Sequence, residues 1–220
     1  SHPFTAIHEA LLERDLDTAR QLLAEWQGAG VNTETMSESE VIRLTLEQAI
    51  IGSHRHVFGP IFWFMLPFGP AGVVLYRLSE LAAQRWPAQA SSSLGSAARS
   101  LFQVIDWIPV RLTAIGFAIV GNFEDAIYGW RFHLRKWSNE LEAIILAAGA
   151  GALGVRLGSP LPEPDSDEAL RMAESGEPPI YDLGIEASLR SLRSAVGLVW
   201  RAVILWLTLI ALMTISVWLG

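Results

Sequence analysis

The chain of 220 residues contains no cysteine. It therefore has no disulfide framework, no thiolate metal ligand and no cysteine nucleophile. Lysine occurs only at Lys136, and the net charge of −7 argues against nucleic acid as a partner. Charged residues make up 18% of the chain, below the roughly one quarter that is typical of soluble domains. With 51% hydrophobic residues, the composition favours a membrane protein whose main partner is the lipid bilayer.

Long uncharged runs indicate where the chain enters the membrane. Residues 202–220 are uncharged and have about the length that a helix needs to cross a bilayer. Residues 57–76 are also uncharged, but prolines and glycines interrupt them. This pattern predicts a kinked span or a re-entrant hairpin rather than a straight helix. The run 112–123 is short for a span by itself. The alanine- and glycine-rich run 143–155 is expected to pack closely on a neighbouring helix.

These patterns predict an all-α, polytopic membrane protein with kinked or re-entrant helices and a helical cytoplasmic portion. We expect four parts: a cytoplasmic helical portion (1–56), membrane-embedded helices (57–158), an acidic proline-rich linker (159–195) and a C-terminal transmembrane helix (196–220). Arginines precede the last helix and no charged residue follows it. The positive-inside rule therefore predicts a cytoplasmic N-terminal flank and a periplasmic C-terminus, in a bacterial inner membrane.

The stretch DWIPVR places Asp106, Pro109 and Arg111 before an apolar run. Asp106 can cap a helix and Pro109 is tolerated in a first turn, so the stretch can be interpreted as a helix start. Asp106 and Arg111 are about 140° apart around a helix, which predicts that they do not pair. Ionisable groups at membrane depth are costly and tend to mark functional sites. A functional role for both residues is therefore the other interpretation.

Two further stretches suggest ligand chemistry. SHRHVFGP contains His54, Arg55 and His56. Histidines two apart do not share a helix face, so we assign no metal site to them. Contact with an anion or lipid headgroup remains open beside a plain solvated edge. GAGALG (149–154) fits a dinucleotide-binding pattern, but an apolar helical run precedes it in place of a strand, so we do not expect nucleotide binding by that mechanism.

Several stretches together resemble one family. They are RDLDTARQLL (14–23), GPIFWFMLPFGPAGVVLYR (59–77), DWIPVRLTAI (106–115), AGALGVRLGSP (150–160) and LVWRAVILWL (198–207). In this order they are similar to the CobD/CbiB family of membrane-bound adenosylcobinamide-phosphate synthases, which includes the relative AmpE. The family normally has further membrane helices ahead of the point where this chain starts. The resemblance therefore implies an N-terminally incomplete chain.

The resemblance implies a reaction that joins adenosylcobyric acid to aminopropanol or its phosphate, with ATP and magnesium. A corrinoid would then be a partner, and carboxylates would hold the Mg²⁺. The synthases carry E-x-x-x-E-N-x-x-D-G before a P-[LI]-F motif. Here Glu47 occupies the first position, but Ile51 and Gly52 replace the Glu-Asn pair. Arg55 and His56 replace Asp-Gly, which reverses the charge at a position that would hold metal.

AmpE resembles the chain in lacking this acidic run and in having an arginine just ahead of its PLFW. It is connected with β-lactamase regulation and has no established catalytic residues. The resemblance therefore predicts a non-catalytic, AmpE-like regulatory or envelope-signalling protein of the inner membrane, with other inner-membrane proteins as partners. A synthase with rearranged residues is the alternative, and transport or an assembly role is a third.

We assign no cofactor; ATP and magnesium belong only to the synthase alternative. That alternative requires Glu47, Asp106 and either Glu124 or Asp125 to converge. If the chain has a site, the catalytic candidates are Glu47 and Asp106. The ligand-binding candidates are Arg55, Arg111, His54 and His56, with the arginines facing an anionic ligand or lipid headgroup.

Overall fold

The computed structural model describes residues 2–28, 32–85, 93–124, 126, 140–158 and 185–219. In these ranges the chain is helical, and strand pairing is limited to one isolated parallel bridge between Val155 and Ile185. The helices are α1 (Pro3–Leu12), α2 (Leu16–Gln27), α3 (Glu38–Ser53), the π-helical turn η1 (His54–Phe58), α4 (Gly59–Met65), α5 (Pro70–Arg85), α6 (Ser93–Val120), α8 (Glu140–Leu153) and α10 (Leu189–Leu219). The predicted all-α fold is confirmed for this part of the chain. Most of the predicted acidic linker, residues 159–184, lies outside it, as does Asp125.

Side-chain caps begin the helices of the N-terminal part. Asp15 accepts a hydrogen bond from the Thr18 amide at the start of α2. Ser37 and Glu40 form a capping box at the start of α3. The helices α1, α2 and α3 share a core with the first turns of α10. One residue from each of the four helices is 0% exposed in this cluster: Ile7, Leu23, Leu46 and Leu192. The start of α10 is thus part of the N-terminal helical core.

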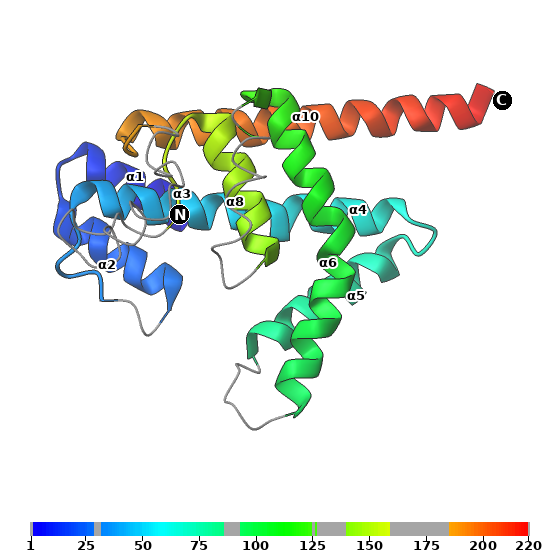
Figure 1. The fold of residues 1–220 in the computed structure, drawn as a ribbon, viewed down its shortest axis with the longest axis horizontal. Coiled ribbons are helices and arrows are strands. Elements are labelled where there is room, and N and C mark those ends of the chain that lie inside the picture. The colour runs from blue at the N-terminus through cyan, green and yellow to red at the C-terminus, as the bar shows by residue number, and fades with distance from the viewer. Residues whose placement is uncertain are drawn as a thin grey trace, which may run out of the picture.

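The uncharged run 57–76 contains a helical hairpin. The helix α3 continues through η1 and α4 to Met65, and α5 returns beside α4 after the turn at residues 66–69 (Figure 1). The two arms approach closely at Gly72, where a Cβ atom would lie 2.5 Å from the Trp63 carbonyl oxygen. Exposed Phe64, Met65 and Phe68 surround the tip. The break that the prolines predict is present, and entry of this tip into a bilayer remains a prediction.

The interpretation of DWIP as a helix start is wrong. The helix α6 begins at Ser93, so Asp106 and Pro109 lie inside it. The alanine, serine and leucine residues before Asp106 favour a helix that begins earlier. Pro109 removes one backbone hydrogen bond inside this helix, and it is tolerated in a packed region where its neighbour Val110 is fully buried. Residues 112–120 are therefore the last part of a long helix rather than a separate short span. Figure 1 shows α6 crossing both α10 and the α3–α4 rod at a steep angle.

The small-residue helix α8 packs closely on a neighbouring helix, as predicted, and the structure shows that this helix is α6. A Cβ atom on Gly121, just after α6, would clash with Ala152 of α8. On another side, a Cβ atom on Gly149 would lie 2.9 Å from Cδ1 of Ile50. The adjacent core brings Phe58 into edge-on contact with Phe117, with ring centroids 5.6 Å apart. The alanines and glycines in the second half of α8 therefore permit close approach of three helices.

Two helices in the described ranges are long and apolar enough to cross a membrane. They are Leu94–Val120 and Leu189–Trp218, judged by length and composition. The most apolar window of the first is 44% buried, whereas that of the second is only 17% buried. The second contains the predicted C-terminal transmembrane helix and begins earlier, inside the N-terminal core. Membrane location is supported, with α10 as the stronger candidate for a span.

After α8 the chain turns back onto α10. The Arg156 amide donates to the Ile185 carbonyl and the Ile185 amide donates to the Gly154 carbonyl, each at 3.0 Å. Gly154, with φ of 66°, supplies the left-handed conformation that ends α8. The two ends of the acidic segment are therefore joined by backbone hydrogen bonds.

Candidate functional site

A buried polar network joins η1, α5 and α6. Nε2 of His54 lies 2.9 Å from Oδ1 of Asp106, and the Tyr76 hydroxyl donates to the same oxygen at 3.0 Å. Nδ1 of His54 lies 2.9 Å from Oγ1 of Thr113. All four residues are buried. His54 is therefore neither a solvated edge nor a headgroup contact, and that expectation is wrong for this residue.

The local geometry explains why His54 turns inward. It begins the π-helical turn η1, which places His54 and Phe58 on the buried side. His54 also lies four positions after the fully buried Ile50, so it continues the buried face of α3. His56 stays exposed, with its Nδ1 2.9 Å from the Gly52 carbonyl oxygen. The two histidines thus face different surroundings, as their spacing predicts.

The network contains alternative proton positions. The Thr113 hydroxyl is placed to donate to the Pro109 carbonyl, 2.9 Å away. If its proton is used there, Nδ1 of His54 donates to Thr113 and a further proton must lie between Nε2 and Asp106. If Thr113 instead donates to His54, a neutral imidazole can donate to the carboxylate from Nε2. In both arrangements the Tyr76 phenol donates its proton to Asp106. The heavy-atom positions of the network are therefore compatible with two arrangements of its protons.

Arg111 lies apart from this network. Its Nη1 donates to the Trp107 carbonyl at 2.9 Å, and its guanidinium carbon lies 4.0 Å from the centroid of the Trp107 ring. The predicted lack of pairing with Asp106 is confirmed, because each residue has other partners. Trp107 is 53% exposed on the outer face of α6. Arg111 is therefore placed for a surface contact rather than for chemistry at Asp106.

Glu47 holds the segment after α8. Its Oε1 accepts a hydrogen bond from the Gly158 amide at 2.7 Å and lies 2.9 Å from Nη1 of Arg43, which also contacts the Gly158 carbonyl. Burial raises the pKa of Glu47, against the opposing effects of Arg43 and the Gly158 amide. Glu47 and Asp106 thus belong to separate hydrogen-bond sets, and Glu124 lies exposed beyond the end of α6.

Arg55 forms an ion pair with Glu142 of α8, with Nη2 2.5 Å from Oε1. Nearby on α5, the almost fully buried Glu80 is paired with Arg77 and accepts a hydrogen bond from Gln84. Within the described ranges, no group of three or more histidine, aspartate or glutamate side chains could hold a metal ion. The convergence that a magnesium site requires is not seen among Glu47, Asp106 and Glu124; Asp125 is outside the described residues.

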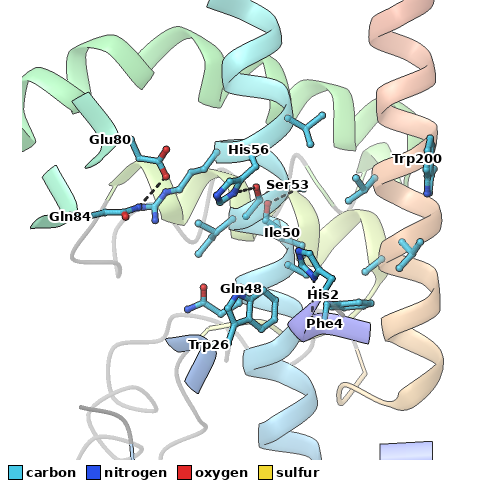
Figure 2. A pocket seen from close by; sticks show the side chains of 18 residues that line it. His2, Phe4, Trp26, Gln48, Ile50, Ser53, His56, Glu80, Gln84 and Trp200 are labelled. Carbon is cyan, nitrogen blue, oxygen red and sulfur yellow. Dashed lines mark hydrogen bonds between the residues drawn. The ribbon is translucent and has the colours of Figure 1, made fainter. Parts of the chain in front are cut away.

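A groove of about 530 Å³ runs along α3 and η1, with Arg55 and His56 in its lining. Figure 2 shows Glu80 and Gln84 of α5 on one side and Trp200 of α10 on the other, with His56, Ser53 and Ile50 between them. His2, Phe4 and Trp26 lie at one end. The volume is in the range of small-molecule sites, about 300–1,000 Å³.

Several residues that take part in these polar contacts were not predicted from the sequence. Tyr76, Thr113, Glu142 and Arg43 are each the partner of a candidate residue that was. The partners of His54, Arg55 and Asp106 lie 30 or more positions away along the chain. One local signal was present, because Arg43 and Glu47 stand four apart on one helix face.

The described residues form a helical protein with two helices apolar enough to cross a membrane, polar groups buried between its helices and a groove beside one of these candidate spans. Residues 2–177 match the model of a family described as CobD/Cbib protein. The chain belongs to this family, as its sequence stretches predict.

Relatives with two different names match the chain. The cobalamin biosynthesis protein CobD of Stutzerimonas stutzeri is 31% identical over 203 residues, which cover 91% of this chain and 63% of the relative. The protein of the same name from Chromobacterium violaceum is 33% identical over 69% of this chain and 48% of the relative. Protein AmpE of Shigella flexneri is 30% identical over 42% of this chain and 34% of the relative. The chain thus spans about half to two thirds of the length of the CobD relatives, and no solved structure matches it.

Proposed function

We propose that this chain is part of a multi-pass inner-membrane protein that keeps the CobD/CbiB scaffold without amide-synthase chemistry and has an AmpE-like regulatory role. The observation that carries the proposal is the ion pair between Arg55 and Glu142. Arg55 occupies the position at which the acidic run of the synthase pattern has an aspartate that would hold metal. A cation at that position, already paired with the nearby carboxylate, opposes the binding of a second cation.

The other buried carboxylates support the same proposal. Glu47 contacts Arg43 and the Gly158 amide, and Asp106 contacts His54 and Tyr76. Glu80 contacts Arg77 and Gln84. Magnesium is usually bound by one or two carboxylates together with waters and substrate phosphates. Breaking any of these three sets of contacts to bind magnesium would leave buried donors or a buried cation without a partner.

The direct test is Mg-ATP-dependent amide formation by the full-length protein in proteoliposomes. The substrates are adenosylcobyric acid and aminopropanol phosphate, and a known synthase reconstituted alongside is the positive control. We expect product from the control only. Product from this protein would refute the proposal. For the regulatory role, deletion of the gene in its host should change β-lactamase induction, and unchanged induction would count against that role.

The synthase is the second candidate, and the names of the relatives favour it, because the CobD proteins match more of the chain than AmpE does. Glu47 and Asp106 would then be the catalytic candidates, with ATP, magnesium and a corrinoid as ligands. If the assay gives product, Glu47→Gln and Asp106→Asn should lower kcat. Retained folding of both variants would separate a catalytic role from the structural contacts seen here.

A further inference from the structure

We propose that the groove along α3 and η1 binds an anionic phospholipid, with the phosphate headgroup at Arg55 and His56 and an acyl chain along α10. The inference depends on the membrane location of the proposed function, and it holds whether or not the protein is a synthase. The groove contains charged and polar side chains on one side and mainly apolar side chains on the other. An amphiphile is the kind of ligand that matches both sides.

The polar side of the groove provides hydrogen-bond donors for a phosphate. Arg55 is 23% exposed, and the guanidinium uses Nη2 on Glu142, which leaves further N–H groups of its planar fork to face a ligand. His56, one position further along η1, is exposed. The amide side chains of Gln48 and Gln84 also line the groove. An arginine with neighbouring amide donors is a typical phosphate contact, and His56, whose Nδ1 donates to the Gly52 carbonyl, lies beside them.

The charge balance favours an anion over a zwitterion with an ammonium group. Glu80 is the acidic residue in the lining of the groove. Its side chain is only 2% exposed, and its two oxygens are used by Arg77 and Gln84. Its charge is therefore compensated from within α5, and it is poorly placed for a ligand's ammonium. The accessible ionisable groups that remain in the groove are Arg55, His56 and His2.

The opposite side of the groove is suited to a hydrocarbon chain. Val196, Val199 and Trp200 of α10 line it, and Val196 and Trp200 are 42% and 63% exposed. From these residues the outer face of α10 continues as exposed Ile204, Leu207 and further apolar side chains. An acyl chain that leaves the groove here would meet a mainly apolar surface along α10.

The position of the groove corresponds to the membrane surface. The helix α10 carries its last charge at Arg201 and is uncharged from there to its end. The hairpin likewise passes from charged to uncharged residues toward its tip. Residues 57–76 are uncharged, and Arg55, Arg77 and Glu80 flank them. Both elements therefore pass from charged to uncharged beside the groove, and tryptophan at Trp200 is typical of this level. A headgroup in the groove would lie at the depth of the other headgroups.

The test is native mass spectrometry of the full-length protein released from detergent, titrated with phosphatidylglycerol and, separately, phosphatidylethanolamine. We expect tighter binding of phosphatidylglycerol. Val196→Glu places a charge on the apolar side and should weaken that binding about tenfold or more, because a carboxylate does not tolerate an acyl chain in contact. Leu12→Glu, at a 48% exposed position outside the groove, is the matched control and should bind like the wild type.

A second variant tests the headgroup without leaving a lone buried charge. The double variant Arg55→Gln/Glu142→Gln removes both charges and keeps hydrogen-bonding groups at both positions. It should lose the preference for phosphatidylglycerol over phosphatidylethanolamine while its melting temperature stays close to that of the wild type. Glycerol phosphate should not displace the lipid; displacement would assign the site to a free phosphate ester. Equal binding of both lipids by the wild type, or unchanged binding by Val196→Glu, would overturn the proposal, and neither result bears on the amide-synthase assay.

Discussion

Nε2 of His54 lies 2.9 Å from Oδ1 of Asp106, and the two side chains are 1% and 4% exposed. This contact connects the π turn η1 to the middle of α6 across 52 positions of sequence. Tyr76 adds α5 to the same oxygen. The three helices that surround the candidate site are therefore linked by one polar contact set rather than by apolar packing alone.

The first prediction concerns this pair. Asp106→Ala should lower the free energy of unfolding by about 3–5 kcal/mol, because removal of one partner leaves buried polar groups unpaired. The double variant His54→Leu/Asp106→Leu should recover part of that loss. Unfolding in mixed detergent micelles, followed by circular dichroism, gives both values. Glu124→Ala, at an exposed carboxylate beyond the end of α6, is the control. A loss of only about 1 kcal/mol would indicate a simple helix cap instead.

The second prediction concerns the contact of α6 with α8. Gly121→Ala places a Cβ atom against Ala152 and should destabilise the protein by about 1–3 kcal/mol. Gly197→Ala is the matched control, because nothing lies within 4 Å of the added atom there. As an alanine in a helix, the control should be neutral or stabilising by up to about 1 kcal/mol. Thermal unfolding in detergent measures both, and equal melting temperatures would contradict the close approach.

The third prediction concerns pH and Glu47. Burial raises the pKa of this carboxyl in the folded state, so the folded protein binds the proton more tightly than the unfolded chain does. The protonated Glu47 carboxyl therefore contributes to stability, fully when the pH is below its pKa in the unfolded chain. This contribution is lost as the pH rises through its pKa in the folded protein. The melting temperature of the wild type relative to Glu47→Gln should therefore increase as the pH falls from about 8 to about 4. A difference that is independent of pH, or that decreases toward acid, would contradict this.

The fourth prediction concerns membrane topology. Because α6 crosses α10 at a steep angle (Figure 1), the two helices cannot both run along the membrane normal. If α10 spans the bilayer, α6 lies along its surface, with Val104, Trp107 and Ile108 exposed toward lipid. These 220 residues contain no cysteine, so single cysteines introduced among them report directly once any cysteine elsewhere in the protein is replaced. Ser100→Cys and Glu124→Cys should react with a membrane-impermeant maleimide from the same side.

The control for this experiment is α10 itself. Arg190→Cys and Val217→Cys should react from opposite sides, with Val217 on the periplasmic side if the positive-inside rule holds. Opposite labelling of Ser100→Cys and Glu124→Cys would show instead that α6 spans the bilayer.

Local sequence signals predicted local structure well. The break between Met65 and Pro70 and the close packing of α8 each depend on residues that are near one another in sequence or on side-chain size. The start of α6 was mispredicted because a cap and a proline also occur inside a helix that tertiary packing stabilises. A proline indicates the start of a helix only when the preceding residues do not already favour a helix, and the residues before Pro109 do favour one.

The candidate site was predicted only in part. His54, Arg55, Asp106 and Glu47 all make specific polar contacts, but their partners could not be identified from spacing. His54 was expected near the surface because it stands among polar residues ahead of the uncharged run, although its spacing of four from the buried Ile50 places it on the inner face of α3. Contacts between α3, α5 and α6 depend on how the hairpin folds back, which a single sequence does not specify.

The backbone bridge between Val155 and Ile185 has a consequence for proteolysis. The segment from 156 to 184 begins and ends at the same place on the fold, where the amides of Arg156 and Ile185 are both bonded. Cutting the chain within that segment would not free α10, because its first turns remain packed with α1 and α3 and its middle with α6. The protein would then persist as two polypeptides that migrate separately only after denaturation. Changes in the length of that segment would likewise leave the helices on either side in register with each other.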